Sequence, residues 1–117
     1  TFSEARECDP EGVDHWISDP WTGPPAGESF AEVADRVGEA REALLREYRG
    51  RTVLVVTHVT PIKVLVQQAM LAPLNALYRM YLDTACLNEV DYYADGPAVV
   101  RSLNDTAHLE RGVATQV

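Results

Sequence analysis

The sequence predicts an α/β domain, and three observations carry this prediction. An uninterrupted β-branched and apolar run spans residues 52–57, helix-forming segments lie on both sides of it, and two strand-like runs follow at 86–93 and 98–103. A run of this kind is typical of a strand that is buried on both faces of a parallel sheet. With 117 residues, 46% of them hydrophobic and 24% charged, the chain has the length and composition of one globular domain.

Two short helices are predicted at the start of the chain. Thr1 and Glu4 form a capping box, which predicts a helix that ends before residue 9. A second helix is expected over residues 10–18. Residues 19–27, DPWTGPPAG, hold too many prolines and glycines for a helix or a sheet strand, and they predict either an ordered loop or a functional lid.

The longest predicted helix begins after Ser29 and ends at Gly50. Ser29 forms a second capping box with Glu32, and apolar residues then recur at helical spacing. The opposite face carries charges that include the i,i+4 pair Glu42 and Arg46. This charged face is interpreted as solvated.

The apolar run at 52–57 is expected to pass into a helix within three residues. Thr60 suits the N-cap and Pro61 the first helical position, and the helix should continue to about residue 71. A strand that is buried on both faces needs a neighbour on each side, whereas the chain offers only a hairpin. We therefore expect that strands are missing from this chain.

The last third of the chain predicts a helix and a hairpin. A helix is expected after Pro73, over residues 74–81, and the strands at 86–93 and 98–103 are expected to join at an Asp95-Gly96 turn. Pro97 makes the second strand an edge strand or delays its start. The residues from 109 to 117 are expected to form a frayed tail.

Charge and composition exclude several classes of function. The net charge of −8 disfavours direct binding to nucleic acid or to an anionic membrane, and no apolar run is long enough to cross a membrane. No signal peptide is visible at the start, so a soluble, cytoplasmic protein is expected. Cys8 and Cys86 lie far apart and predict free thiols, and neither a metal site nor a cofactor is expected.

His58 is the main candidate for chemistry, because it lies between the predicted central strand and the following helix. Open α/β sheets bind ligands at this position, where a helix start offers free amides and positive potential that suit phosphate. Thr57 and Thr60 add hydroxyl groups on either side of it. The alternative, a structural histidine that donates to a backbone carbonyl, stays open. His15 is interpreted as a surface residue and His108 as part of a turn.

Two segments resemble a known family. PPAGESFAEVADRV at 24–37 and RTVLVVTHVTPIKVLV at 51–66 resemble the histidine phosphatase superfamily, also called phosphoglycerate mutase-like, and the segment 87–109 is similar to its acid phosphatase and alpha-ribazole phosphatase branch. That branch includes the second domain of bifunctional ribonuclease H and acid phosphatase proteins. The resemblance implies a three-layer α/β fold that here lacks its N-terminal strands, including the nucleophile strand. Residues 1–117 would then be the C-terminal portion of one histidine phosphatase domain.

The resemblance also implies a reaction and a site. Members of the superfamily use the histidine of an Arg-His-Gly motif to attack phosphorus and form a phosphohistidine, while two arginines and a second histidine hold the phosphoryl oxygens and a carboxylate protonates the leaving group. His58 matches the second histidine, with Thr57 and Val59 beside it in the phosphate site. Glu28 and Ser29 match a segment near the pocket mouth, which implies a substrate-side role.

These features predict a phosphomonoester hydrolase of the acid phosphatase type for the intact domain. The sequence contains no Arg-His-Gly motif, so the isolated chain is expected to be inactive. The expected partners are a small phosphorylated substrate, inorganic phosphate, and either a second copy of the chain or the missing N-terminal half of the domain. Two alternatives stay open: phosphoryl transfer of the phosphoglycerate mutase type, and an inactive fragment or anion-binding module that another chain completes.

Overall fold

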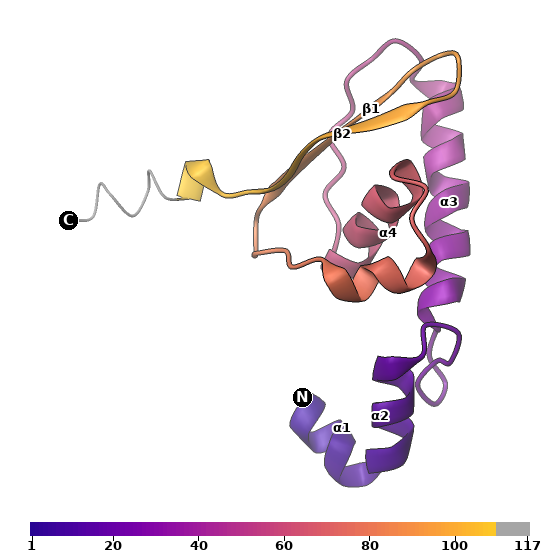
Figure 1. The fold of residues 1–117 in the computed structure, drawn as a ribbon, viewed down its shortest axis with the longest axis vertical. Helices are drawn as coiled ribbons and strands as arrows, with labels where there is room; N and C mark the ends of the chain where they lie inside the picture. Colours follow the sequence, from indigo (N-terminus) through magenta and orange to yellow (C-terminus); the bar gives the residue numbers. More distant parts are fainter. Residues whose placement is uncertain (110–117) are drawn as a thin grey trace, which may run out of the picture.

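The helices and strands follow the predicted order along the chain. The computed structural model describes residues 1–109. In order, the elements are α1 (Phe2–Cys8), α2 (Pro10–Ser18), α3 (Phe30–Glu47), α4 (Val59–Ala69), the 3-10 helix η1 (Leu74–Arg79), β1 (Leu87–Tyr92) and β2 (Ala98–Asp105). Figure 1 shows α4 and η1 against the long helix α3, with the β1–β2 hairpin at one end and α1 and α2 at the other.

The core lies between α3 and α4. Val64 and Val66 of α4 are completely buried, and the core cluster joins Val64 to Val37 of α3 and Leu77 of η1. Burying such a side chain stabilises the fold by about 1.5–3 kcal/mol. This core fixes α4, and therefore the start of α4, relative to α3.

Polar contacts lock the same two helices together. The side-chain amide of Gln68 donates to the carbonyl of Ala34 at 3.1 Å, and its oxygen accepts from Arg41 at 2.6 Å. Gly38 lies opposite this amide, since a Cβ there would come within 3.4 Å of the Gln68 nitrogen. A Cβ at that distance would make only an ordinary van der Waals contact, so the approach of α3 and α4 does not require a glycine at this position.

Both predicted capping boxes are confirmed. Thr1 with Glu4 caps α1, and Ser29 with Glu32 caps α3. The predicted hairpin is confirmed as well: β1 and β2 pair antiparallel, Gly96 takes a positive φ of 110° in the turn, and β2 begins directly after Pro97.

The predicted buried strand at residues 52–57 is wrong for this chain. The segment is extended, yet it pairs with no strand within residues 1–109, where the sheet consists of β1 and β2 alone. Leu54 and Val56 are 81% and 89% exposed, and Val53 and Val55 are 42% and 47% exposed. The apolar pattern is typical of a buried strand, but a strand also needs a hydrogen-bonding partner, and the described part of the chain supplies none.

Some predicted boundaries also need correction. His58, not Thr60, is the N-cap of α4, so Pro61 occupies the third helical position, where its missing N–H leaves no intrahelical bond unmade. The α4 helix ends at Ala69, and the helix predicted over 74–81 is a 3-10 helix over Leu74–Arg79. β2 extends to Asp105, and most of the tail predicted to fray, residues 110–117, lies outside the described residues.

Two predictions about composition can be compared with the structure. Cys8 and Cys86 are free thiols, as expected. Among the described helices, none combines the length and the apolar character needed to cross a membrane.

The contrast between the core and the exposed segment predicts two different mutational effects. Val64→Ala should lower the free energy of unfolding by about 2–3 kcal/mol, because it opens a cavity between α3 and α4. Leu54→Ala should change it by less than about 0.5 kcal/mol, because that side chain is exposed. Urea unfolding of both variants measures the difference, and an equally large effect of Leu54→Ala would show that the segment is packed in solution.

Candidate functional site

His58 lies at the junction of the extended segment and α4. It is the N-cap residue of α4 with an extended backbone (φ −102°, ψ 169°), and its side chain is exposed. No side-chain hydrogen bond of His58 exists within residues 1–109, so the alternative of a histidine that donates to a backbone carbonyl finds no support in the described part of the chain. The imidazole is therefore available to a ligand.

The start of α4 differs from the starts of the other α-helices. Side chains of Thr1, Asp9 and Ser29 accept hydrogen bonds from the first turns of α1, α2 and α3, respectively. No side chain caps α4, and the backbone amides of Val59 and Thr60 have no acceptor within the described residues. An uncapped first turn offers donors and positive potential to an anion.

Thr57 and Val59 flank His58 as the sequence predicts. The Thr57 side chain is half-buried, and Val59 is 45% exposed. Their assignment to a substrate site stays a prediction, because no ligand is present. Thr60, which we expected to cap the helix, is half-buried in its first turn.

Glu28 and Ser29 have other partners in this structure. Both carboxylate oxygens of Glu28 accept from the Arg36 guanidinium at 3.0 Å. Ser29 is 4% exposed; its hydroxyl accepts from the amide of Glu32, whose carboxylate accepts from the amide of Ser29. No hydrogen bond or ion pair joins either residue to His58 in residues 1–109, and their substrate-side role stays a prediction.

The loop between α2 and α3 is held in place by Asp19. One carboxylate oxygen accepts from the amide of Trp21 at 3.0 Å and the other from the hydroxyl of Thr22 at 2.8 Å. These two hydrogen bonds, the one from Trp21 first, hold the pKa of Asp19 below its usual value. The amide of Ala31 donates to the carbonyl of Pro20, which ties the loop to α3. The loop is thus ordered, as one of the two predicted alternatives stated.

A row of four aromatic rings crosses from the first two helices to the core. The ring centroids of Phe2 and Trp16 lie 6.0 Å apart, those of Trp16 and Phe30 lie 6.0 Å apart, and those of Phe30 and Tyr78 lie 5.9 Å apart. We call these four residues the aromatic row. Its members come from α1, α2, α3 and η1, so the row connects the helix pair α1 and α2 to the rest of the domain.

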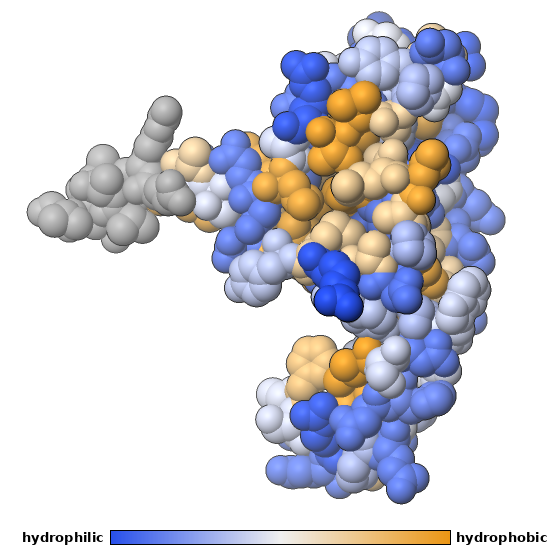
Figure 2. Space-filling view, in the orientation of Figure 1, coloured by the Kyte–Doolittle hydropathy of each residue, from blue (hydrophilic) through white to orange (hydrophobic). Residues whose placement is uncertain are grey.

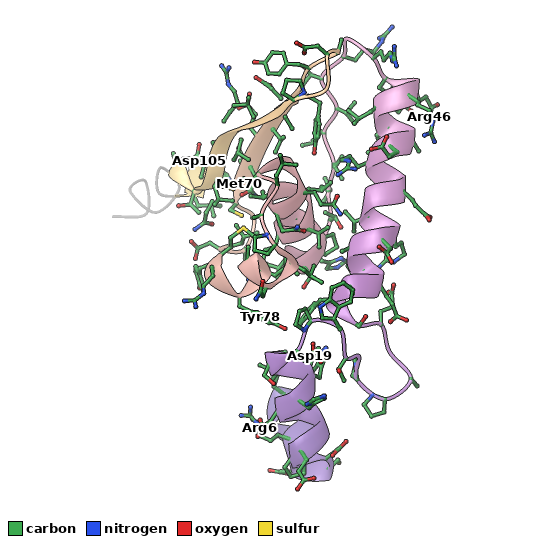
Figure 3. The ribbon with its side chains drawn as sticks, turned by 45° about the vertical axis from the view of Figure 1, so that its right-hand side comes forward. Arg6, Asp19, Arg46, Met70, Tyr78 and Asp105 are labelled. Carbon is green, nitrogen blue, oxygen red and sulfur yellow. The ribbon has the colours of Figure 1, made fainter. Side chains whose placement is uncertain are left out.

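Figure 2 shows a hollow in the molecular surface between the lower part of the molecule, formed by α1 and α2, and the part above it. Figure 3 shows Tyr78 projecting from η1 toward the lower helices, on the side where Asp19 lies. The start of α4, where His58 is the N-cap, lies beside η1, at the end of α4 that faces α1 and α2 (Figure 1).

No pattern in the sequence predicts the aromatic row. These four residues are separated by 12 or more positions, and no periodicity connects them.

A shallow depression of about 430 Å³ lies between residues 21–27 and the first turns of α3, and His58 does not line it. Ser29, one of the two predicted substrate-side residues, lines this depression together with Glu32 and Asp35.

The fold and the site define an α/β domain with an exposed histidine at an uncapped helix start. A family model described as "Histidine phosphatase superfamily (branch 1)" matches residues 1–106. The chain therefore belongs to the histidine phosphatase superfamily, and the part that it contains has the phosphoglycerate mutase-like fold.

Known proteins resemble this chain over nearly its whole length. "Bifunctional protein Rv2228c" of Mycobacterium tuberculosis is 48% identical over 109 residues, which are 93% of this chain and 30% of that protein. The solved structure "Bacillus stearothermophilus YhfR" has a TM-score of 0.83 at 30% identity, over 93% of this chain and 55% of its own. The alpha-ribazole phosphatase from Shigella flexneri has a TM-score of 0.72 at 26% identity, over 88% of this chain and 51% of its own. The chain thus spans about a third to a half of the length of these relatives.

The hydrogen bonds of Asp19 predict how the loop responds to acid. Because the folded-state pKa of Asp19 is lowered, its stabilisation of the loop is complete above the ordinary value of 3.8 and is lost as the pH falls through the lower folded value. The amide resonances of Trp21 and Thr22, followed by NMR from pH 6 to pH 2, should therefore shift with a midpoint below 3.8. Asp19→Asn should abolish this transition, and a midpoint at or above 3.8 in the unmodified chain would contradict the assignment.

Proposed function

We propose that the intact domain hydrolyses phosphate monoesters through a phosphohistidine intermediate, as an acid phosphatase does, and that this chain supplies the second, phosphate-stabilising histidine. The observation that carries the proposal is the position of His58, exposed at the one α-helix start of residues 1–109 that no side chain caps. Membership of the histidine phosphatase superfamily and the likeness to an alpha-ribazole phosphatase support it.

The role of His58 follows from the charge that phosphoryl transfer develops. The transferred group carries negative charge on three oxygens, and donors fixed in advance around it lower the barrier. An imidazole N–H of His58 and the free amides of Val59 and Thr60 are such donors. The macrodipole of α4 adds positive potential at the same place.

The nucleophile comes from outside this sequence, which contains no Arg-His-Gly motif. In the proposed reaction a nucleophilic histidine nitrogen bonds to phosphorus while the ester P–O bond breaks, and the leaving oxygen takes a proton from a carboxylic acid. Water then gives a proton to the resulting carboxylate and attacks phosphorus, the P–N bond breaks, and inorganic phosphate leaves. We infer that the isolated chain performs neither step and that the missing N-terminal half of the domain supplies the nucleophile.

A second candidate function is an anion-binding module without chemistry. The unpaired backbone at 52–57 favours this alternative, because a second copy of the chain could pair with it and complete the sheet. Such a module would bind phosphate and would form a dimer, whereas it would not turn over a phosphate ester.

Turnover of para-nitrophenyl phosphate at mildly acidic pH distinguishes the two. A protein that carries the missing N-terminal half as well as residues 1–117 should hydrolyse the ester, and His58→Ala should lower kcat/KM by about 10²–10³, the usual effect of removing one donor to a developing oxyanion. His108→Ala serves as the matched control, since that histidine is also exposed and follows β2 in the chain. Its kcat/KM should stay within twofold of the unmodified protein.

Two results would contradict the proposal. Full activity of His58→Ala would remove His58 from the phosphate site. Binding of phosphate without turnover by the extended protein, together with a dimer in solution, would favour the anion-binding module instead.

A further inference from the structure

The geometry points to a docking surface for the missing half of the domain, which we infer to consist of both backbone edges of residues 52–57 and the exposed face formed by Leu54 and Val56. We call these two side chains the docking face. The partner that fits is a polypeptide with two β-strands, one for each edge, and an apolar helix that covers the docking face. The identity of this partner rests on the proposed function, and its binding needs no covalent link to residues 1–117.

Both backbone edges of residues 52–57 are free in the described part of the chain. The segment is extended, and none of its amides or carbonyls takes part in a backbone hydrogen bond within residues 1–109. In an extended chain, alternate residues present these groups to opposite edges. Two copies of this chain that paired through the segment would close one edge of each copy and leave the other edge free. A partner that completes both edges must therefore bring two strands.

The exposure of the segment alternates between its two faces. Val53 and Val55 are 42% and 47% exposed, whereas Leu54 and Val56, which project to the opposite face, are 81% and 89% exposed. The chain's own residues thus half-cover one face and leave the docking face in water. Strands of this composition lie between two covering layers of helices in α/β domains. The partner therefore needs an apolar helix as well as strands.

The whole chain exposes more surface than a complete domain of its size. Its accessible surface is 8777 Å², whereas a compact monomer of 12.9 kDa exposes about 6,300 Å². Residues 110–117 could add about 1,200 Å² at most, the area of an unfolded stretch of that length. The remaining excess is larger than the area of about 800 Å² that each partner buries in a standard interface. A partner that covers this surface can therefore bind as a separate chain.

The missing half fits this surface better than a second copy of the chain does. The chain spans about half of the two solved relatives described above, so nearly as much polypeptide again completes those domains. A second copy brings a net charge of −8 toward a chain of the same charge, and this repulsion disfavours the pair. Pairing with a second copy is therefore the competing outcome of the experiment.

Co-expression of two separate chains tests the docking surface. The probe is the stretch of "Bifunctional protein Rv2228c" that directly precedes the 109 matched residues and has the same length, produced with an affinity tag. Together with the untagged 117-residue chain, it should yield a complex of one copy of each chain by gel filtration. In this complex the amides of residues 53–57 should exchange at least about 100-fold more slowly than in the 117-residue chain alone, because they are paired.

A matched pair of variants assigns the docking face. Leu54→Lys should lower the yield of complex at least about tenfold, because it places a charge where the helix of the partner would pack. Leu71→Lys is the control: Leu71 is 93% exposed but lies after α4, outside the segment, and this variant should keep the yield within about twofold. Neither side chain belongs to the core, so the protection of α4 from exchange should be unchanged in both variants.

Each result decides one question. Equal yields for Leu54→Lys and Leu71→Lys would remove the docking face from the interface. Failure of the probe to bind, or dimers of the 117-residue chain that pair through residues 53–57, would overturn the docking of the missing half.

Turnover of para-nitrophenyl phosphate separates the docking surface from the proposed function. A two-chain complex that forms but does not hydrolyse the ester would contradict the proposed function alone. Hydrolysis by a single chain that joins the probe to residues 1–117, without association of the separate chains, would contradict the docking alone.

Discussion

Residues 52–57 need a backbone partner that the described residues do not supply, and the position of His58 depends on that partner. An extended segment presents amides and carbonyls on both sides, and the four consecutive apolar residues 53–56 project toward both faces. Leaving such groups unpaired and such side chains in water costs free energy that a sheet would recover. The same segment leads directly into His58, so the element that most needs a partner is also the one that carries the candidate catalytic histidine.

The helix that follows His58 is held in place without that pairing. α4 is held against α3 by Val64 and by the two hydrogen bonds of Gln68, so the free amides at its start are fixed in space. The strand that precedes His58 is not fixed by any ladder in the described residues. Catalysis of phosphoryl transfer requires reacting groups to be placed closely, and a small misplacement is costly. Pairing of residues 52–57 with another strand would therefore also fix the position of His58.

Local features of this fold were predictable from the sequence, and features that depend on distant contacts were not. The capping boxes at Thr1 and Ser29 and the turn at Gly96 are local and were confirmed, since each depends on residues within a few positions. Whether residues 52–57 form a paired strand could not be predicted from these residues alone, because a β-ladder needs a second segment to pair with. The aromatic row joins residues from four elements, and the ion pair of Glu28 with Arg36 spans eight positions, so neither left a periodic signal.

Amide hydrogen exchange of the 117-residue chain measures whether residues 52–57 are paired. The amides of residues 53–57 should exchange nearly as fast as in an unfolded peptide, because they have no acceptor in residues 1–109, while the amides of Val64 and Val66 in the core helix should be strongly protected. Protection of residues 53–57 comparable to that of α4 would mean that the segment is already paired and that this chain alone holds His58 in place, and it would overturn the dependence of His58 on an added strand.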